Sequence, residues 1–232
     1  IITFADLTSG ERYTGLDRIT NANDITVSLQ SSHRGINALT KDKDLLNMRI
    51  AQSFYTDDEV VSDTANTNYE TRKSYSDIAA SIDIALGKYV ITNSAQFNPD
   101  TSKIVKRENS ISYTSSSRKF ISLSYSDDSV TRTGKIYGAY PLNSSIHMFG
   151  GLDRKITKAS GNGIINSYTT GIAYESCCWA FRIAHFQEDK GEGDRSHNYS
   201  TGFELVLTGL GSTSSPLKDR IENNIPGYTL NL

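Results

Sequence analysis

Alternation between apolar and polar residues is the feature that most constrains how this chain can fold. Ile25, Val27 and Leu29 share one face of their segment, and Thr26 and Ser28 take the other face. This period of two is that of a β-strand with one apolar face. The pattern recurs near residues 46–50, 78–86, 89–97, 111–113, 121–125, 136–140, 146–148, 168–174, 179–183 and 203–207. We therefore predict an all-β fold of about eleven antiparallel strands, at a spacing of roughly 21 residues that suits an outer-membrane barrel.

The polar faces of these segments are compatible with two architectures, a soluble β-sandwich and a transmembrane β-barrel. These faces carry Asp77, Ser81, Asp83, Thr92, Ser94, Ser122, Ser124, Arg182 and Glu204. They would meet bulk water in a sandwich, whereas in a barrel they would line a wet lumen while the apolar faces met lipid. Sandwich strands usually have about 5–6 residues, and segments 74–87 and 198–209 are longer. Strand length therefore favours the barrel.

The positions of the aromatic residues and the lengths of the connections also favour the barrel. Tyrosines that suit the aromatic girdles of a barrel lie near strand ends, at Tyr55, Tyr89, Tyr125, Tyr140 and Tyr174. Short connections at 86–89, 114–118, 141–145 and 174–178 alternate with connections at 55–73, 98–103, 127–132, 156–163 and 188–197 that are mostly longer and more polar. Outer-membrane barrels have short periplasmic turns and longer external loops. Segment 31–44 is an exception, because it is a long connection at the end of the strands where the other connections are short.

Cys177 and Cys178 are the only cysteines of the chain, and they are adjacent. Their α-carbons lie about 3.8 Å apart, whereas an unstrained disulfide needs roughly 5.5–6 Å. A bridge between the two would therefore be strained. Disulfides to another chain, or to a part of the protein outside this sequence, are one possibility, and two reduced thiols are the other. A periplasmic position for this turn would allow disulfides to form.

Composition and charge narrow the function further. The mean hydropathy is -0.43, and no window reaches the roughly 20 apolar residues of a transmembrane helix. The net charge of -2 comes from 24 basic and 26 acidic residues that are interspersed, so we expect no nucleic acid partner. No signal peptide is recognisable, and Ile1 is not an initiator residue. We therefore expect a piece of a longer protein.

Catalytic, cofactor and metal sites find little support in the sequence. The histidines, at positions 33, 147, 185 and 197, have no ligand spacing, and no G-x-S-x-G elbow occurs. Asp57, Asp58 and Glu59, like Asp127 and Asp128, suit solvated loop tips, and divalent cation binding there stays open. We predict no catalytic residue, no metal site and no cofactor.

Four stretches carry a family resemblance: GIAYESCCWAFRIAH (171–185), GLDRITNANDITVSL (15–29), GFELVLTGLG (202–211) and PLKDRIENNIPGY (216–228). They resemble the C-terminal barrel portion of the LPS-assembly protein (LptD) family, also called organic solvent tolerance proteins. The paired cysteines at an aromatic-rich strand entry are the most specific feature, and GLDRI followed by a strand is the next. The middle of the chain, residues 56–158, agrees mainly in the rhythm of strands and loops.

The resemblance implies an outer-membrane lipopolysaccharide translocon component of a Gram-negative bacterium, which inserts LPS into the outer leaflet through a lateral gate of its barrel. Residues 1–209 would be the C-terminal portion of a larger barrel of about 26 strands, and residues 210–232 a periplasmic tail. The implied partners are LPS, the lipoprotein plug LptE, the periplasmic bridge protein LptA through an N-terminal domain absent here, and the barrel-assembly machinery. Neither an enzyme activity nor a cofactor is implied.

The resemblance also assigns roles to residues of this chain. Cys177 and Cys178 would form disulfides with cysteines of the missing N-terminal region. The lateral-gate strand would contain Asn198, Tyr199, Ser200, Thr201, Gly202, Phe203, Glu204 and Leu205, with its polar first half as the soft end. Gly202 lowers strand propensity, and close packing is the other interpretation of this glycine.

Two other functions are weighed against this one. A general porin or diffusion channel would need a complete barrel and no cysteine pair, and an outer-membrane enzyme on a small barrel would need a catalytic constellation at one rim. Neither accounts for Cys177 and Cys178 together with a C-terminal segment that continues beyond the last strand. The species, the LPS chemotype and the plug interface cannot be derived from the sequence.

Overall fold

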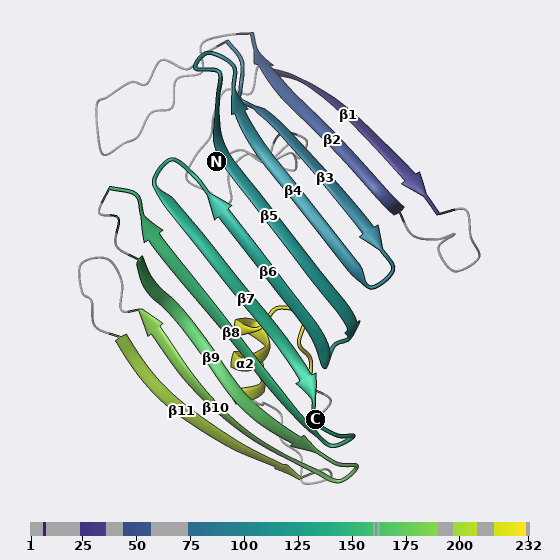
Figure 1. The fold of residues 1–232 in the computed structure, drawn as a ribbon, viewed down its shortest axis with the longest axis vertical. Helices are drawn as coiled ribbons and strands as arrows, with labels where there is room; N and C mark the ends of the chain where they lie inside the picture. The colour runs from purple at the N-terminus through teal and green to yellow at the C-terminus, as the bar shows by residue number, and fades with distance from the viewer. Residues whose placement is uncertain are drawn as a thin grey trace. The chain divides into compact units, whose positions relative to one another are not determined.

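The fold is an eleven-stranded antiparallel sheet in which each strand pairs with its neighbours in the sequence (Figure 1). The computed structural model describes residues 7, 24–35, 44–56, 74–159, 161, 163–189, 197–207 and 216–230. The elements are β1 (Asp24–Arg34), β2 (Asp44–Tyr55), β3 (Ile78–Leu86), β4 (Tyr89–Asn98), β5 (Lys103–Ser116), β6 (Lys119–Asp127), β7 (Thr131–Pro141), β8 (Ile146–Thr157), β9 (Gly163–Glu175), β10 (Trp179–Asp189), β11 (His197–Leu207) and the helix α2 (Pro216–Asn224). The predicted all-β class and number of strands are confirmed, while closure and the total strand count of a larger barrel stay predictions.

The strands are long, from 9 residues in β3 to 14 in β5. Transmembrane β-strands need about 9–11 residues, whereas strands of soluble sheets have about 5–6. Among the described residues, no helix is long and apolar enough to cross a membrane.

The chain divides into two compact units. The first comprises residues 1–86 and 92–108, and the second residues 87–91 and 109–232. In the first unit, β1 pairs with β2 and β2 with β3. One face of β1 exposes Ile25, Val27 and Leu29, each at 59% or more. On the other face of this unit, Arg49 forms an ion pair with Asp83.

The second unit shows the same inversion of burial more completely. Apolar side chains on one face of β6 to β11, such as those of Ile121, Ile183 and Phe203, are exposed. The residues that alternate with them point to the opposite face, which carries the fully buried Arg182 and the buried Glu175. We call the first face the apolar face and the second the polar face. A soluble protein buries its apolar side chains and leaves its charges in water. The inversion is the arrangement of a sheet whose apolar face meets lipid.

The short connections lie where the sequence predicts them. Gly87 and Lys88 join β3 to β4, and residues 117–118, 142–145 and 176–178 form the other short turns. Gly87 adopts a φ of 62°, which a glycine accommodates without strain in a two-residue hairpin turn. Two of the loops at the opposite end are described throughout, at residues 99–102 and 128–130. The predicted exception, between β1 and β2, lies mostly outside the described residues.

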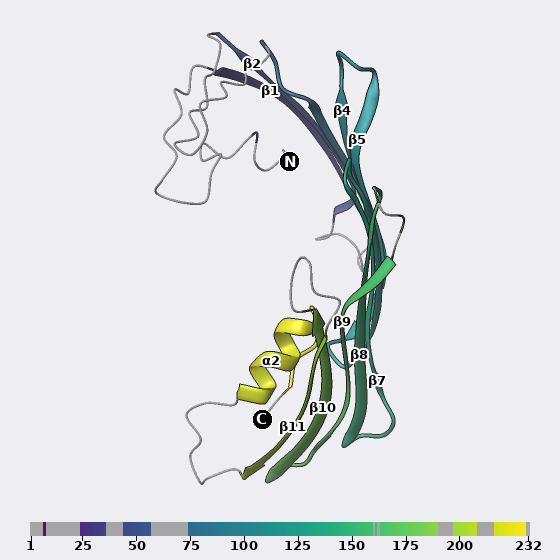
Figure 2. The same ribbon diagram turned by 90° about the vertical axis from the view of Figure 1, so that its left-hand side faces the viewer.

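Helix α2 covers part of the polar face of the second unit (Figure 2). Ile221, Ile225, Tyr228 and Leu230, from the helix and the segment after it, are buried in one cluster. The sheet contributes to this cluster Phe120, Ala139, Phe149, Ala173, Ala184 and Phe186. Pro216 opens the helix, a position where the missing N–H of proline costs nothing. The C-terminal segment therefore folds back onto the sheet, and its periplasmic location stays a prediction.

Candidate functional site

The candidate site begins at the turn between β9 and β10, which carries both cysteines. Ser176 organises this turn: its hydroxyl donates to the Trp179 carbonyl at 2.9 Å and accepts from the Trp179 N–H at 3.2 Å. The ring centroids of Tyr174 and Trp179 lie 4.5 Å apart beside the turn. Cys177 and Cys178 are exposed and unbridged. Both thiols are therefore accessible to a partner.

The two sulfur atoms lie 2.9 Å apart, which is longer than a disulfide bond of about 2.05 Å. Contact with the Cys177 side chain raises the pKa of the Cys178 thiol, and Coulombic interaction with Cys177 acts in the same direction. A raised pKa lowers the fraction of reactive thiolate at neutral pH. The pair therefore holds Cys178 in its less reactive, protonated form.

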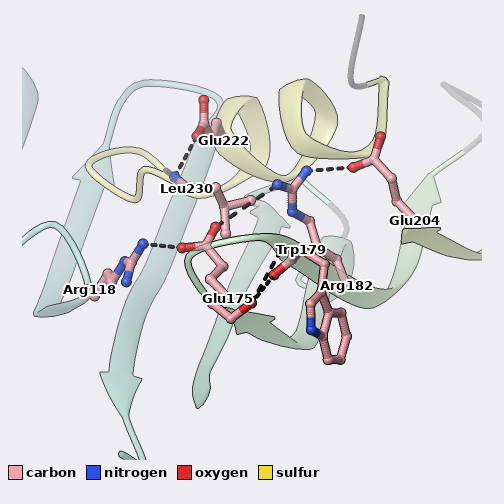
Figure 3. Close-up of polar contacts among 8 residues, drawn as sticks. Arg118, Glu175, Trp179, Arg182, Glu204, Glu222 and Leu230 are labelled. Atoms are coloured by element: carbon pink, nitrogen blue, oxygen red, sulfur yellow. Dashed lines mark hydrogen bonds and ion pairs between the residues drawn. The ribbon is translucent and has the colours of Figure 1, made fainter. Parts of the chain in front are cut away.

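The residue immediately before the turn, Glu175, belongs to a buried cluster of charges on the polar face (Figure 3). Arg118, from the turn between β5 and β6, forms an ion pair with Glu175. Arg182 of β10 lies 3.9 Å from the other carboxylate oxygen of Glu175. Arg182 also donates to Glu204 of β11 at 2.5 Å. The cluster thus connects the cysteine turn to the last strand of the sheet.

Strand register explains why these charges meet. Arg182 pairs directly with Glu204 across β10 and β11, and Glu175 pairs with Ala180 across β9 and β10. Side chains of one face that are two residues apart on adjacent strands are diagonal neighbours. Arg182 is 0% exposed, and a buried charge is tolerated only where opposite charges compensate it. The carboxylates on both sides supply that compensation.

Helix α2 packs beside this cluster and limits its contact with water. The Tyr228 ring lies 5.0 Å from the Phe149 ring and 5.7 Å from the His147 ring, between centroids. Burial raises the pKa of the Tyr228 phenol, so the hydroxyl stays neutral. Arg220 of the helix stacks 4.0 Å from the Phe186 centroid and pairs with Glu188 at 2.8 Å.

Two glycines of the sheet make the close packing possible. A Cβ at Gly171 would lie 2.5 Å from the Phe149 ring and 2.3 Å from the Ile183 carbonyl. A Cβ at Gly202 would lie 2.7 Å from the side chain of Leu217 in α2. Close packing, the alternative interpretation of Gly202, is therefore what the structure shows.

The predicted gate segment, residues 198–205, divides between the two faces of β11. Tyr199, Phe203 and Leu205 lie on the apolar face and are 58–78% exposed. Gly202 and Glu204 lie on the polar face with Asn198 and Ser200, under α2 or beside Arg182. Strand order places β11 at one end of the sheet. Arg182 connects Glu175, the residue before the cysteine turn, to Glu204 of the predicted gate segment.

Other predicted candidates form no site in the described parts of the chain. Asp128 accepts hydrogen bonds from the backbone N–H groups of Thr131 and Val130, which lower the pKa of its carboxyl. Asp127 pairs with Lys158 at 2.5 Å, so both carboxylates serve their own loop. Residues 57–59 lie outside the described residues. In the described ranges, no three His, Cys, Asp or Glu side chains are grouped around a possible metal position.

Sequence reasoning missed the role of Glu175, the contribution of Arg118 and the docking of α2. The opposite charges of Arg182 and Glu204, both on the predicted polar face, were a usable signal for a luminal ion pair. The four-residue spacing of Leu217, Ile221 and Ile225 was a signal for a helix with one apolar side.

The LptD family profile, described as LPS transport system D, matches residues 2–150. An LPS-assembly protein LptD of Pseudoalteromonas atlantica is 26% identical over 239 residues, which cover 97% of this chain and 30% of that protein. Its namesake from Shewanella frigidimarina is 28% identical over 228 residues, covering 89% of this chain and 28% of that protein. The protein of the same name from Burkholderia lata is 23% identical over 237 residues, covering 97% and 29%.

This chain therefore spans about 30% of the length of the curated relatives it matches. The family match covers well over half of its residues, and the long antiparallel strands with an exposed apolar face agree with that match. The chain belongs to the LptD family.

Proposed function

We propose that this chain is the C-terminal barrel portion of an outer-membrane protein that inserts lipopolysaccharide into the outer leaflet. Residues 1–209 supply strands of a larger barrel, and residues 210–232 form a segment that follows the last strand. LPS is the substrate that passes through, and no bond chemistry is assigned to any residue. The match to proteins named for LPS assembly supports this function over a general diffusion channel.

The inversion of burial across the sheet is the single observation that carries the proposal. Phe203 and Leu205 expose apolar side chains on one face of β11, while Glu204 between them pairs with the fully buried Arg182 on the other face. An amphiphile needs both environments, because its acyl chains leave toward lipid while its charged sugar head requires a hydrophilic lumen. A polar lumen with an openable seam provides both.

The seam is assigned to β11, and strand order supports this. β11 pairs with β10 on one side and ends the sheet on the other. An unpaired strand edge within a membrane is costly, so in the full barrel it requires a partner strand. We propose that this partner is the first strand of the barrel, which lies outside this sequence. We assign residues 198–205 to the gate, with residues 198–202 as its weaker half.

The exposed thiols are assigned to long-range disulfides. Cys177 and Cys178 are the only cysteines of the sequence, so bridges other than one between themselves require cysteines of another chain or of the longer protein, and we propose the longer protein. Their exposure at a short turn is compatible with this. We propose that these bridges mark the mature transporter, which further engages the plug LptE, the bridge protein LptA and the barrel-assembly machinery in the outer membrane.

A seam lock tests the gate. In the full-length protein, a cysteine at Ser200 is cross-linked to cysteines placed along the first barrel strand, and newly made LPS is followed to the cell surface. Export is expected to stop when the seam is closed covalently. The matched control is a cross-link between Phe181 and Leu205, which already pair across β10 and β11. Export that continues with the seam fully locked would refute the gate.

Maturation is tested by mapping the disulfides of the unreduced full-length protein from its native membrane. Bridges from Cys177 and Cys178 to distant cysteines are expected. Two free thiols, or a bridge between the neighbours, would contradict the assignment.

A further inference from the structure

The apolar face of the second unit contains a hollow that the export function does not use. Its volume is about 450 Å³, within the range of about 300–1,000 Å³ of small-molecule sites. Its lining includes the apolar-face residues Ile121, Tyr140 and Met148. These side chains are 46–54% exposed and stand around the hollow instead of filling it. A hollow at this position is open to an apolar ligand.

Two adjacent glycines create the hollow. Gly138 and Gly150 pair across β7 and β8, between Ile121 of β6 and Thr170 of β9. The apolar face therefore lacks two neighbouring side chains in a single row. Both glycines line the hollow, whereas Gly134, on the same face of β7, does not.

Backbone geometry does not require a glycine at position 150. Among the described residues, positive φ values of glycine occur at Gly87, Gly161 and Gly227. A Cβ at Gly150 would lie 3.4 Å from the Thr169 carbonyl, an ordinary contact, whereas at Gly138 it would lie 3.0 Å from the Phe120 carbonyl. Glycine inside a strand weakens the strand and often marks a close approach. Folding alone thus leaves Gly150 unexplained.

A single cation stands at one end of the hollow. Lys119 lines it, and its ammonium lies 5.4 Å from the centroid of the Tyr140 ring. In the described part of the chain, no carboxylate pairs with Lys119. Lys119 begins β6 directly after a short turn, and Tyr140 lies next to the end of β7. Gly138 is two residues farther from that end, about 6–7 Å along the strand. The charge therefore sits at the rim, and the apolar part of the hollow extends away from it.

We infer that this hollow binds an acyl chain of one glycerophospholipid, whose phosphate contacts Lys119. This arrangement matches an amphiphile, because an apolar slot receives the chain and a lone cation receives the anionic head. The inference rests on the proposed function for its orientation: the short turns face the periplasm, where the adjacent leaflet consists of phospholipid. LPS is the less suitable occupant, since it lies in the opposite leaflet and carries several acyl chains.

Native mass spectrometry of the full-length protein in complex with the proposed plug LptE tests this inference. The complex is reconstituted in vesicles of phosphatidylethanolamine and phosphatidylglycerol, extracted in mild detergent, and weighed for retained lipid. Wild type is expected to retain one phospholipid. Gly150→Leu fills the hollow and is expected to lower retention roughly tenfold, because the leucine displaces several buried methylene groups of the lipid acyl chain. Gly134→Leu is the matched control: its Cβ meets open space outside the hollow, and retention is expected to stay at the wild-type level.

The charge is tested in the same way. Lys119→Gln is expected to lower retention about threefold, the scale of a partly exposed ion pair, and Lys119→Arg to preserve it. A second measurement avoids dependence on the folding of Gly150→Leu: a photoreactive residue at Met148 is expected to capture phospholipid after extraction. The same residue at Ile136, on this face outside the hollow, is expected to capture little.

Several results would overturn the inference. They are an absence of retained lipid in wild type, retention of LPS in the hollow, equal retention by Gly150→Leu and Gly134→Leu, and equal capture at Met148 and Ile136. The two proposals fail separately. A locked seam that still exports LPS contradicts the gate whatever the hollow retains, and equal retention by the two leucine variants contradicts the hollow whatever the gate does.

Discussion

Removal of the Arg182 side chain is the perturbation that most directly tests the buried charge cluster. Arg182→Met replaces the arginine by a shorter, unbranched apolar side chain. Glu204 loses the guanidinium at 2.5 Å, and Glu175 loses the same guanidinium at 3.9 Å while keeping Arg118. The side chains of Glu175 and Glu204 are only 4% and 15% exposed. Both poorly hydrated carboxylates then lose the cation that lies between them.

The magnitude follows from burial. Breaking a buried ion pair by removing one partner costs about 3–5 kcal/mol, because it leaves an uncompensated charge. The side chain of Arg182 is 0% exposed, so water does not screen the loss. The matched control is Arg132→Met: Arg132 lies 3.6 Å from Asp127 and is 52% exposed. An exposed pair of this kind contributes about 0–1 kcal/mol. The two arginine variants should therefore differ by roughly 3 kcal/mol.

The assay is equilibrium unfolding of the full-length protein in lipid vesicles by denaturant, followed by fluorescence and by the band shift of folded barrels. Arg182→Met with Glu204→Met is expected to recover part of the loss, because buried ion pairs are often replaced by apolar residues without cost. A difference between Arg182→Met and Arg132→Met below about 1 kcal/mol would refute the argument, since exposed pairs already span that range.

Three further predictions concern the helix and the turns. Gly202→Val is expected to push the Leu217 side chain aside, because its Cβ would lie 2.7 Å from the Leu217 Cδ1, and so to loosen α2 and raise its cleavage by protease; Leu217→Ala should restore protection, and unchanged cleavage of Gly202→Val would contradict the packing. In the reduced full-length protein, Cys178 is expected to alkylate slowly near neutral pH because Cys177 raises its pKa, so Cys177→Ser should accelerate the reaction; an unchanged rate would count against the coupling. Asp128 has a lowered carboxyl pKa, so its stabilisation of the loop is present above the ordinary aspartate value and lost as the pH falls through the lowered one; amide exchange of the loop should rise there, and an equal rise in Asp128→Ala would be contrary to this.

The sequence is sufficient for the strands and for the two faces of the sheet. Alternation has a local cause, because successive side chains of a strand point to opposite sides. The segments around Ile25, Ile121 and Phe203 therefore show from spacing alone which residues are exposed on the apolar face. Strand ends are less determined: the strand predicted near residues 111–113 extends over Lys103–Ser116 in the structure. At the ends of a strand, polar residues continue the backbone hydrogen bonding of the sheet. No alternation of apolar residues marks these ends in the sequence.

The site is only partly predictable because it depends on contacts between distant residues. Cys177 and Cys178 are conspicuous in the sequence, but Arg118 is 57 residues away from its partner Glu175. In the sequence, nothing distinguishes Glu175 from the other acidic residues. Its role follows from the strand register, which places it diagonally opposite Arg182. Close packing at Gly171 and at Gly202 depends on their missing side chains, which leave room for Phe149 and for Leu217 of α2. Such vacant space has no local pattern in the sequence.

The shared arginine links the residue before the cysteine turn to the end strand β11. Glu175 precedes the cysteine turn, Glu204 lies on the end strand β11, and both interact with Arg182. In a buried network, a group that loses one partner interacts differently with those that remain, so the energies are not additive. A displacement of Glu175 is therefore expected to change the interaction between Arg182 and Glu204. A change at the turn that moves Glu175 would thus act on the end strand through one side chain.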